Sequence, residues 1–174
     1  MWPPMAALVI LAALTTALPV AGAPASTGLA VQAGAVGKRA PDFTVRTVDG
    51  KTFRLSAQRG KVVVFDFLVP GCGECEVEAP WLGTAARMFG SRGVKVLILD
   101  VSGLGDADLR RFYRPYRLEK ALIARDNGFG VARKYRVTSL GTTVVVGGDG
   151  TIRWRGSWVG DEDRLLNAIR RALA

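Results

Sequence analysis

The alternation of apolar and polar positions predicts two β-hairpins, one near each end of the folded part of the chain. Residues 43–48 and 51–54 alternate around an Asp-Gly pair, which is typical of a tight hairpin turn. Residues 142–146 and 151–157 flank a second Asp-Gly pair in the same way. We therefore expect two antiparallel pairs of strands.

Between the hairpins, the hydrophobic pattern predicts alternating strands and helices. Residues 61–68 and 94–100 are apolar nearly throughout, as expected for strands covered on both faces. A helix is expected over 73–89, and Pro80 predicts a kink or break in its first half. The other expected elements are a helix over 106–116 with Asp106 as a possible N-cap, a strand at 121–124, a short helix at 130–135 and an amphipathic helix over 161–173.

This order of elements predicts the fold class. A β-α-β start, followed by an antiparallel hairpin and a terminal helix, is typical of a mixed sheet. We therefore expect an α/β protein with a mixed central β-sheet flanked by helices and with an N-terminal β-hairpin. About 140 residues follow the apolar leader, which is enough for one compact domain.

The first 25 residues have the pattern of a signal peptide or an N-terminal anchor. Residues 6–18 are apolar, but about 13 residues are short for a bilayer span, which needs about 20. Ala21-Gly22-Ala23 fits a signal-peptide cleavage site, although the leader has no Lys or Arg before its apolar run. Residues 26–37 are expected to be a flexible linker and 38–174 the folded domain. The predicted location is extracytoplasmic: the periplasm or the outer face of the cytoplasmic membrane, either secreted or anchored.

The only two cysteines, Cys72 and Cys75, directly follow the buried strand at 61–68 and begin the helix at 73–89. Free N–H groups and the helix dipole at a helix N-terminus favour a thiolate. A disulfide across so short a loop stabilises the fold little. The spacing therefore favours redox chemistry over a structural cross-link.

Charge and composition narrow the possible partners. The net charge is +9, and residues 1–37 contain no charged side chain, so the whole excess lies on the domain. Six basic residues between 110 and 125 could form a solvated helix face, or a surface for an acidic partner or an anionic membrane. No nucleic-acid module is visible, no nucleotide-binding motif follows a strand, and no cofactor is expected.

Several short motifs follow one another in order along the chain. They are GKRAPDF at 37–43, DGK at 49–51, LS at 55–56, GKVVV at 60–64, CGEC at 72–75, EAPWL at 78–82, YRV at 135–137, TT at 142–143 and GDG at 148–150. Together they make the chain resemble the thioredoxin superfamily, and in particular the exported TlpA-like redoxins grouped with the alkyl hydroperoxide reductase/thiol-specific antioxidant proteins. The resemblance implies a thioredoxin-like fold, a protein thiol or disulfide as substrate and an upstream electron donor.

The resemblance also implies roles for four residues. Cys72 is the expected nucleophile, and Cys75 the buried partner that resolves the mixed disulfide. Asp66 lies where thioredoxin has a buried acid, and could exchange a proton with Cys75. The alternative is that Asp66 only accepts a hydrogen bond. Glu78 could tune the pair, or be a surface helix residue without a role.

The chain departs from the family pattern at three places. Gly71 precedes the first cysteine where relatives usually have tryptophan. Glu74 places a negative charge beside the thiolate, which favours a stable disulfide and a reducing dithiol. Gly141 occupies the position of a cis-proline that faces the cysteine pair, and Gly71, Leu140, Gly141 and Thr142 are the expected substrate-binding residues.

Three functions are compatible with these features. The first is an extracytoplasmic thiol–disulfide oxidoreductase, expected to reduce protein disulfides. The second is a binding module whose cysteine pair is a structural disulfide or a metal clip. The third is a peroxidase, although Phe65 and Val69 replace the Pro and Thr that a peroxidatic cysteine has upstream.

Overall fold

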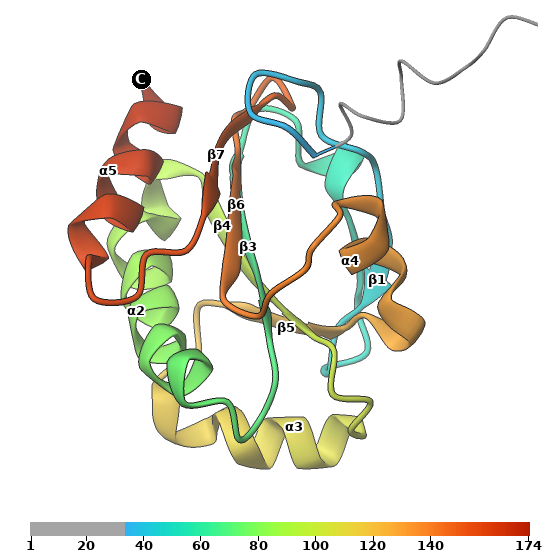
Figure 1. Ribbon diagram of the computed structural model, residues 1–174. Coiled ribbons are helices and arrows are strands. Elements are labelled where there is room, and N and C mark those ends of the chain that lie inside the picture. The colour runs from blue at the N-terminus through green and yellow to red at the C-terminus, as the bar shows by residue number, and fades with distance from the viewer. Residues whose placement is uncertain (1–33) are drawn as a thin grey trace, which may run out of the picture.

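The computed structural model describes residues 34–174 and has a five-stranded mixed sheet at its centre (Figure 1). The three strands β5, β4 and β3 are parallel, whereas β6 and β7 run antiparallel to their neighbours. The strands, in their order across the sheet, are β5 (Leu122–Arg125), β4 (Val94–Asp100), β3 (Val62–Leu68), β6 (Thr142–Val146) and β7 (Ile152–Gly156). This confirms the predicted mixed sheet and its C-terminal hairpin.

Helices cover both faces of this sheet. The helices α2 (Gly73–Phe89) and α5 (Glu162–Leu173) lie on one face (Figure 1). The helix α3 (Asp106–Tyr113) lies at the end of the sheet that is near the N-terminus of α2. The opposite face is covered by α4 (Gly130–Lys134) and by the predicted N-terminal hairpin. That hairpin consists of β1 (Thr44–Arg46) and β2 (Thr52–Arg54).

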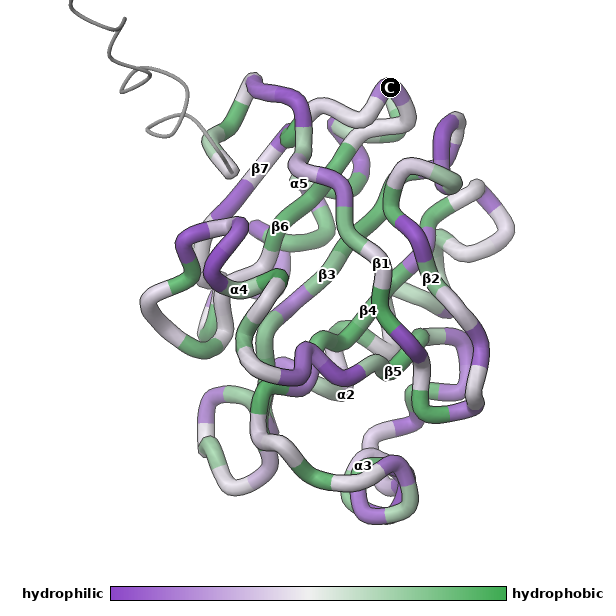
Figure 2. The backbone as a smooth tube through the Cα atoms, turned by 90° about the vertical axis from the view of Figure 1, so that its right-hand side faces the viewer, coloured by the Kyte–Doolittle hydropathy of each residue, from purple (hydrophilic) through white to green (hydrophobic). Residues whose placement is uncertain are grey.

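Each face of the sheet contributes to its own hydrophobic core, and Figure 2 shows the central strands coloured mostly hydrophobic. Alternate residues of a strand point to opposite faces. In β3, Val62, Val64 and Leu68 face α2, while Phe65 and Phe67 face the hairpin and α4. Both faces are buried, which explains why this run is apolar at almost every position.

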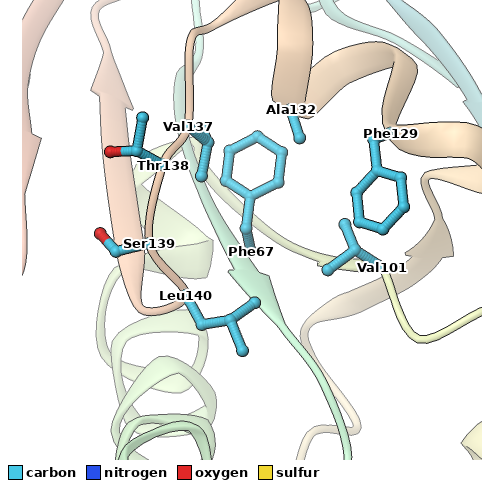
Figure 3. Close-up of a pocket in the computed structure, with 8 residues that line it drawn as sticks. All are labelled: Phe67, Val101, Phe129, Ala132, Val137, Thr138, Ser139 and Leu140. Atoms are coloured by element: carbon cyan, nitrogen blue, oxygen red, sulfur yellow. The ribbon is translucent and has the colours of Figure 1, made fainter.

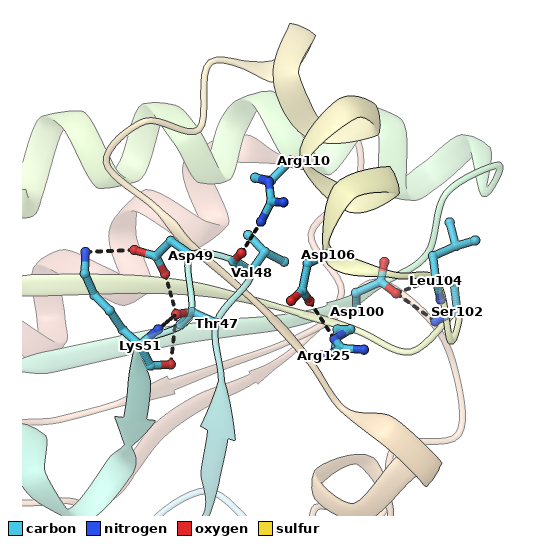
Figure 4. A network of polar contacts seen from close by, with 10 residues as sticks. All are labelled: Thr47, Val48, Asp49, Lys51, Asp100, Ser102, Leu104, Asp106, Arg110 and Arg125. Atoms are coloured by element: carbon cyan, nitrogen blue, oxygen red, sulfur yellow. Dashed lines mark hydrogen bonds and ion pairs between the residues drawn. The ribbon is translucent and has the colours of Figure 1, made fainter.

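The structure corrects the predicted helix over 106–116. The α-helix ends at Tyr113, and Arg114–Tyr116 form a 3-10 turn because Pro115 cannot continue the α-helical hydrogen bonding. Asp106 is the first helical residue and not the N-cap, which is Gly105. The Asp106 carboxylate instead pairs with the Arg125 guanidinium at 2.8 Å (Figure 4).

The predicted break at Pro80 does not occur. The α2 helix is assigned without interruption from Gly73 to Phe89. Ala79 and Leu82 are fully buried on either side of Pro80. We attribute the continuity to this packing, which holds the helix against the sheet across the missing hydrogen bond.

Two of the basic residues between 110 and 125 have structural partners. Arg110 of α3 donates a hydrogen bond to the carbonyl of Val48 (Figure 4). The Val48 N–H donates to the Ile123 carbonyl at 2.8 Å. Arg125 pairs with Asp106. These contacts join the N-terminal hairpin, α3 and β5, so this part of the positive charge supports the fold.

The predicted leader, residues 1–25, and most of the predicted linker lie outside the described residues. The last residues assigned to the linker contact the domain: the Gly34 carbonyl accepts a hydrogen bond from Arg155 at 3.2 Å. The Gly37 N–H also donates to the Ile152 carbonyl at 2.8 Å. Within residues 34–174, no helix is both long and apolar enough to cross a bilayer.

Candidate active site

The two cysteines lie where the buried strand β3 passes through a short turn into α2. Cys72 is the N-cap of α2, and its sulfur accepts a hydrogen bond from the Cys75 N–H at 3.3 Å. The two sulfurs form a disulfide, with the Cα atoms 5.2 Å apart. Cys72 is half-buried, whereas Cys75 is only 2% exposed. Only Cys72 is therefore accessible to a protein substrate.

Asp66 lies on β3 and faces α2, the same side of the sheet as Cys75. Its carboxyl is fully buried and accepts a hydrogen bond from the Thr143 hydroxyl, while its Oδ1 has no partner among the described residues. The Thr143 hydroxyl itself accepts from the Trp158 indole at 2.7 Å. Burial raises the pKa of Asp66 to about 6, although the hydrogen bond from Thr143 opposes this.

Glu78 lies one turn after Cys75 on the buried face of α2, because residues three apart on a helix are neighbours. Its side chain is fully buried, so the alternative that Glu78 is a surface residue is wrong. Neither carboxyl oxygen has a hydrogen-bond partner among residues 34–174. Burial, together with the negative charges of Asp66 and Glu74, raises the pKa of Glu78 to about 8.

These two carboxyls form a buried acidic pair near Cys75. Each carboxylate raises the cost of ionising the other, because there is little solvent between them to screen the repulsion. At neutral pH, Glu78 therefore holds a proton one helical turn from Cys75. A buried, protonated carboxyl at this place can exchange a proton with a thiolate that forms or leaves there.

The loop before β6 and the first residue of that strand carry three of the predicted substrate-binding residues. Gly141 has a φ of +68°, and its N–H donates to the Phe67 carbonyl at 3.1 Å. No cis peptide bond occurs within residues 34–174. Leu140 is 37% exposed, whereas Thr142 is buried and donates its hydroxyl to the Ser139 carbonyl at 2.8 Å. The fourth predicted residue, Gly71, lies in the exposed turn before Cys72.

A mostly apolar cavity of about 170 Å³ adjoins this loop (Figure 3). Phe67 and Leu140 contribute to its wall, and Phe129, half exposed, lines it from the segment before α4. Phe129 was not among the predicted site residues, because its only signal in the sequence is an apolar residue between two glycines. Thr143 and Trp158 were likewise not predicted as the polar network around Asp66.

Within the part of the chain that the structure describes, no three side chains of His, Cys, Asp or Glu gather in a way that could hold a metal ion. The sulfurs of Cys72 and Cys75 are bonded to each other in the disulfide.

Comparison with known proteins places the chain in a family. The AhpC/TSA family model matches residues 36–155. The thiol-disulfide oxidoreductase ResA of Bacillus thuringiensis subsp. konkukian is 31% identical over 117 residues, which are 67% of this chain and 66% of the relative. ResA of Bacillus subtilis is 28% identical over 116 residues, which are 67% of this chain and 64% of ResA. The match thus spans slightly less than two thirds of the length of these relatives.

A solved structure shares the fold over nearly its whole length. The protein, from Chlorobium tepidum, is assigned as the thiol:disulfide interchange protein DsbE; it is 25% identical, with a TM-score of 0.72, over 80% of this chain and 99% of its own. The expected thioredoxin-like fold is therefore confirmed. With its oxidised Cys72–Cys75 pair at the start of α2, the chain belongs to the AhpC/TSA family of thioredoxin-like redoxins.

Proposed function

We propose that the protein is an extracytoplasmic thiol–disulfide oxidoreductase that reduces disulfides in other proteins. The observation that carries this proposal is the disulfide between a half-buried Cys72 at a helix N-terminus and a buried Cys75. In this arrangement one sulfur is accessible to a partner and the other can resolve the adduct.

The reaction begins with the reduced pair. The Cys72 thiolate attacks one sulfur of a substrate disulfide, forming a mixed disulfide and releasing the other substrate sulfur as a thiolate. Cys75 then loses its proton and attacks the Cys72 sulfur, which breaks the mixed disulfide and releases the second substrate thiolate. The substrate gains two electrons and the Cys72–Cys75 disulfide is restored. A dithiol electron donor reduces the pair again by the same exchange.

Asp66 and Glu78 are proposed to handle the proton of Cys75. Cys75 lies beside Glu78 on α2, and Asp66 faces the same core from β3. A buried carboxyl with a raised pKa can take the proton as Cys75 becomes a nucleophile and return it when the pair is reduced. The negative charge of Glu74 between the cysteines supports the reducing direction.

Gly71, Leu140, Gly141 and Thr142 are proposed to receive the substrate beside Cys72, with an apolar substrate side chain in the adjoining cavity. The half-exposed Phe129 and the exposed part of Leu140 support this proposal, because large apolar side chains at an opening are typical of contact surfaces.

The Leu140→Ala variant should lower kcat/KM for a protein disulfide roughly tenfold, because an apolar contact of this size contributes about 1–3 kcal/mol. The rate with a small-molecule disulfide should not change. The matched control is Met88→Ala, which removes an apolar side chain that is somewhat more exposed, at 47% against 37%, near the far end of α2. An equal loss for both kinds of substrate would argue against docking at Leu140.

The extracytoplasmic location is supported by the leader pattern of residues 1–25 and by the absence of charge up to residue 37. The proposed partners are a protein disulfide and an upstream dithiol donor. The excess positive charge of the domain would favour an acidic partner or an anionic membrane surface.

The proposal is tested by catalysis with the full chain. We expect the protein to accelerate the reduction of insulin disulfides by dithiothreitol, followed as turbidity, and to leave the rate of peroxide consumption at its background value. Peroxide turnover would favour the peroxidase alternative. A lack of activity toward both substrates would favour the binding module.

A further inference from the structure

The Glu78 carboxyl fills the space beside the Cα of Gly141, although the two residues lie far apart in the sequence. A Cβ atom built on Gly141 would lie 2.7 Å from Oε2 of Glu78, 3.0 Å from Oε1 and 3.1 Å from Cδ. The first of these distances is shorter than real Cβ contacts allow. All three of the nearest atoms belong to the Glu78 carboxyl. The space that a side chain at position 141 would need is therefore occupied by this carboxyl.

The loop around Gly141 is held from the other side. Its N–H donates to the Phe67 carbonyl at 3.1 Å, a bond that proline could not form. The next residues continue directly into the β3–β6 ladder, in which Thr142 pairs with Phe67 and Thr143 with Asp66. The backbone at 141 is thus fixed to the sheet, whereas the Glu78 carboxyl is the end of a flexible side chain. If atoms were added at 141, the carboxyl would move.

We propose that Gly141 is a positioning residue for the thiol–disulfide reaction: its missing side chain leaves the space in which the Glu78 carboxyl is held between α2 and the loop before β6. This inference rests on the proposed function, because the carboxyl is positioned for the resolving cysteine. It assigns to Gly141 a role that a side chain of any size would remove.

The groups around Glu78 determine how its ionisation would change if its carboxyl were displaced. Asp66 faces the carboxyl from β3, Glu74 acts on it from the first turn of α2, and Cys75 lies one turn before it. Asp66 and Glu74 are acids and Cys75 is uncharged in the disulfide, and among the described residues no cation or hydrogen-bond donor offsets the two acids at the carboxyl. If a methyl group forces the loop and the carboxyl apart, water can reach the carboxylate and its ionisation becomes easier.

The test is the Gly141→Ala variant of the full chain with its disulfide intact. The titration of the Glu78 side-chain carboxyl is followed by carbon-13 NMR in this variant and in the unmodified protein. We expect the midpoint to fall by one pH unit or more. The midpoint potential of the cysteine pair is also measured between pH 5 and 9. The pH at which the plot of potential against pH changes slope should be lower in Gly141→Ala than in the unmodified protein, by the same amount as the Glu78 midpoint.

Gly93→Ala is the matched control. Gly93 has a φ of +84°, and a Cβ built there meets nothing within 4 Å, so the variant adds the backbone strain without the contact. We expect the Glu78 midpoint to be unchanged in Gly93→Ala. An unchanged midpoint in folded Gly141→Ala would overturn the inference.

If Gly141→Ala does not fold, the double variant Gly141→Ala/Glu78→Ala decides. It should regain the fold, because the clash has been removed; continued unfolding would show that the backbone needs glycine for another reason and would overturn the inference. Failure of the proposed function gives a different result: the cysteine pair would not cycle, while the titration of Glu78 would still report on Gly141.

Discussion

The Cys72→Ser variant is expected to lose all catalysis, with insulin reduction falling to the rate of dithiothreitol alone. A serine hydroxyl forms no disulfide, so no mixed disulfide can begin the reaction. The fold should be retained, because Cys72 is the N-cap of α2 and serine is among the preferred N-cap residues. The variant therefore removes the chemistry while keeping the helix start.

The Cys75→Ser variant should stop one step later. Cys72 can still attack a substrate disulfide, but no second thiol is present to resolve the adduct. We expect a stable complex between protein and substrate on non-reducing gels that disappears on reduction. Cys72→Ser serves as the control and should form no complex. Turnover by Cys72→Ser, or adducts formed through Cys75 alone, would contradict the assignment of Cys72 as nucleophile.

The second large effect concerns stability, which is expected to fall as the pH rises from about 4 to about 8. Asp66 and Glu78 both have a folded-state pKa above the ordinary value, at about 6 and about 8. Between the ordinary and the raised value, the unfolded chain releases its proton while the folded protein keeps it. Rising pH therefore favours unfolding, and the stability contributed by proton binding is fully present only below the ordinary pKa values.

The magnitude follows from the size of the shifts. One pKa unit corresponds to about 1.4 kcal/mol, so Asp66 alone should account for a loss of about 3 kcal/mol. The measurement is the free energy of unfolding in urea at pH 4, 6 and 8, with the disulfide intact.

The Glu78→Gln variant tests whether Glu78 causes the loss of folding stability above pH 6. Glutamine has nearly the same shape but does not ionise, so the variant should lose less stability between pH 6 and 9 than the unmodified protein. Glu76→Gln is the matched control, because Glu76 is an exposed acid on the same helix. If both variants followed the same pH profile, a buried protonated Glu78 would be excluded.

Local patterns were sufficient to predict the main elements of the fold. The run of β3 is apolar because both of its faces are buried, and the helix predicted over 73–89 has the bounds observed for α2. The spacing of Cys72 and Cys75 likewise predicted the disulfide pair at the helix start. These features depend on residues that are close in the chain.

The contacts that complete the site depend on residues far apart in the chain and could not be predicted in this way. Asp66 meets Thr143 only through the antiparallel register of β3 and β6. Gly141 meets Glu78 only because α2 and the loop before β6 converge on the same end of the sheet. Asp106 had the sequence of an N-cap, but the helix begins at this residue and its carboxylate is paired with Arg125.

The midpoint potential of the Cys72–Cys75 pair tests the central claim most directly. The full chain is equilibrated in graded thiol/disulfide buffers, and free thiols are counted by alkylation. The account predicts one reversible two-electron transition below roughly −200 mV, in the range of reducing dithiols. A pair that is reduced only when the protein unfolds would contradict a redox function.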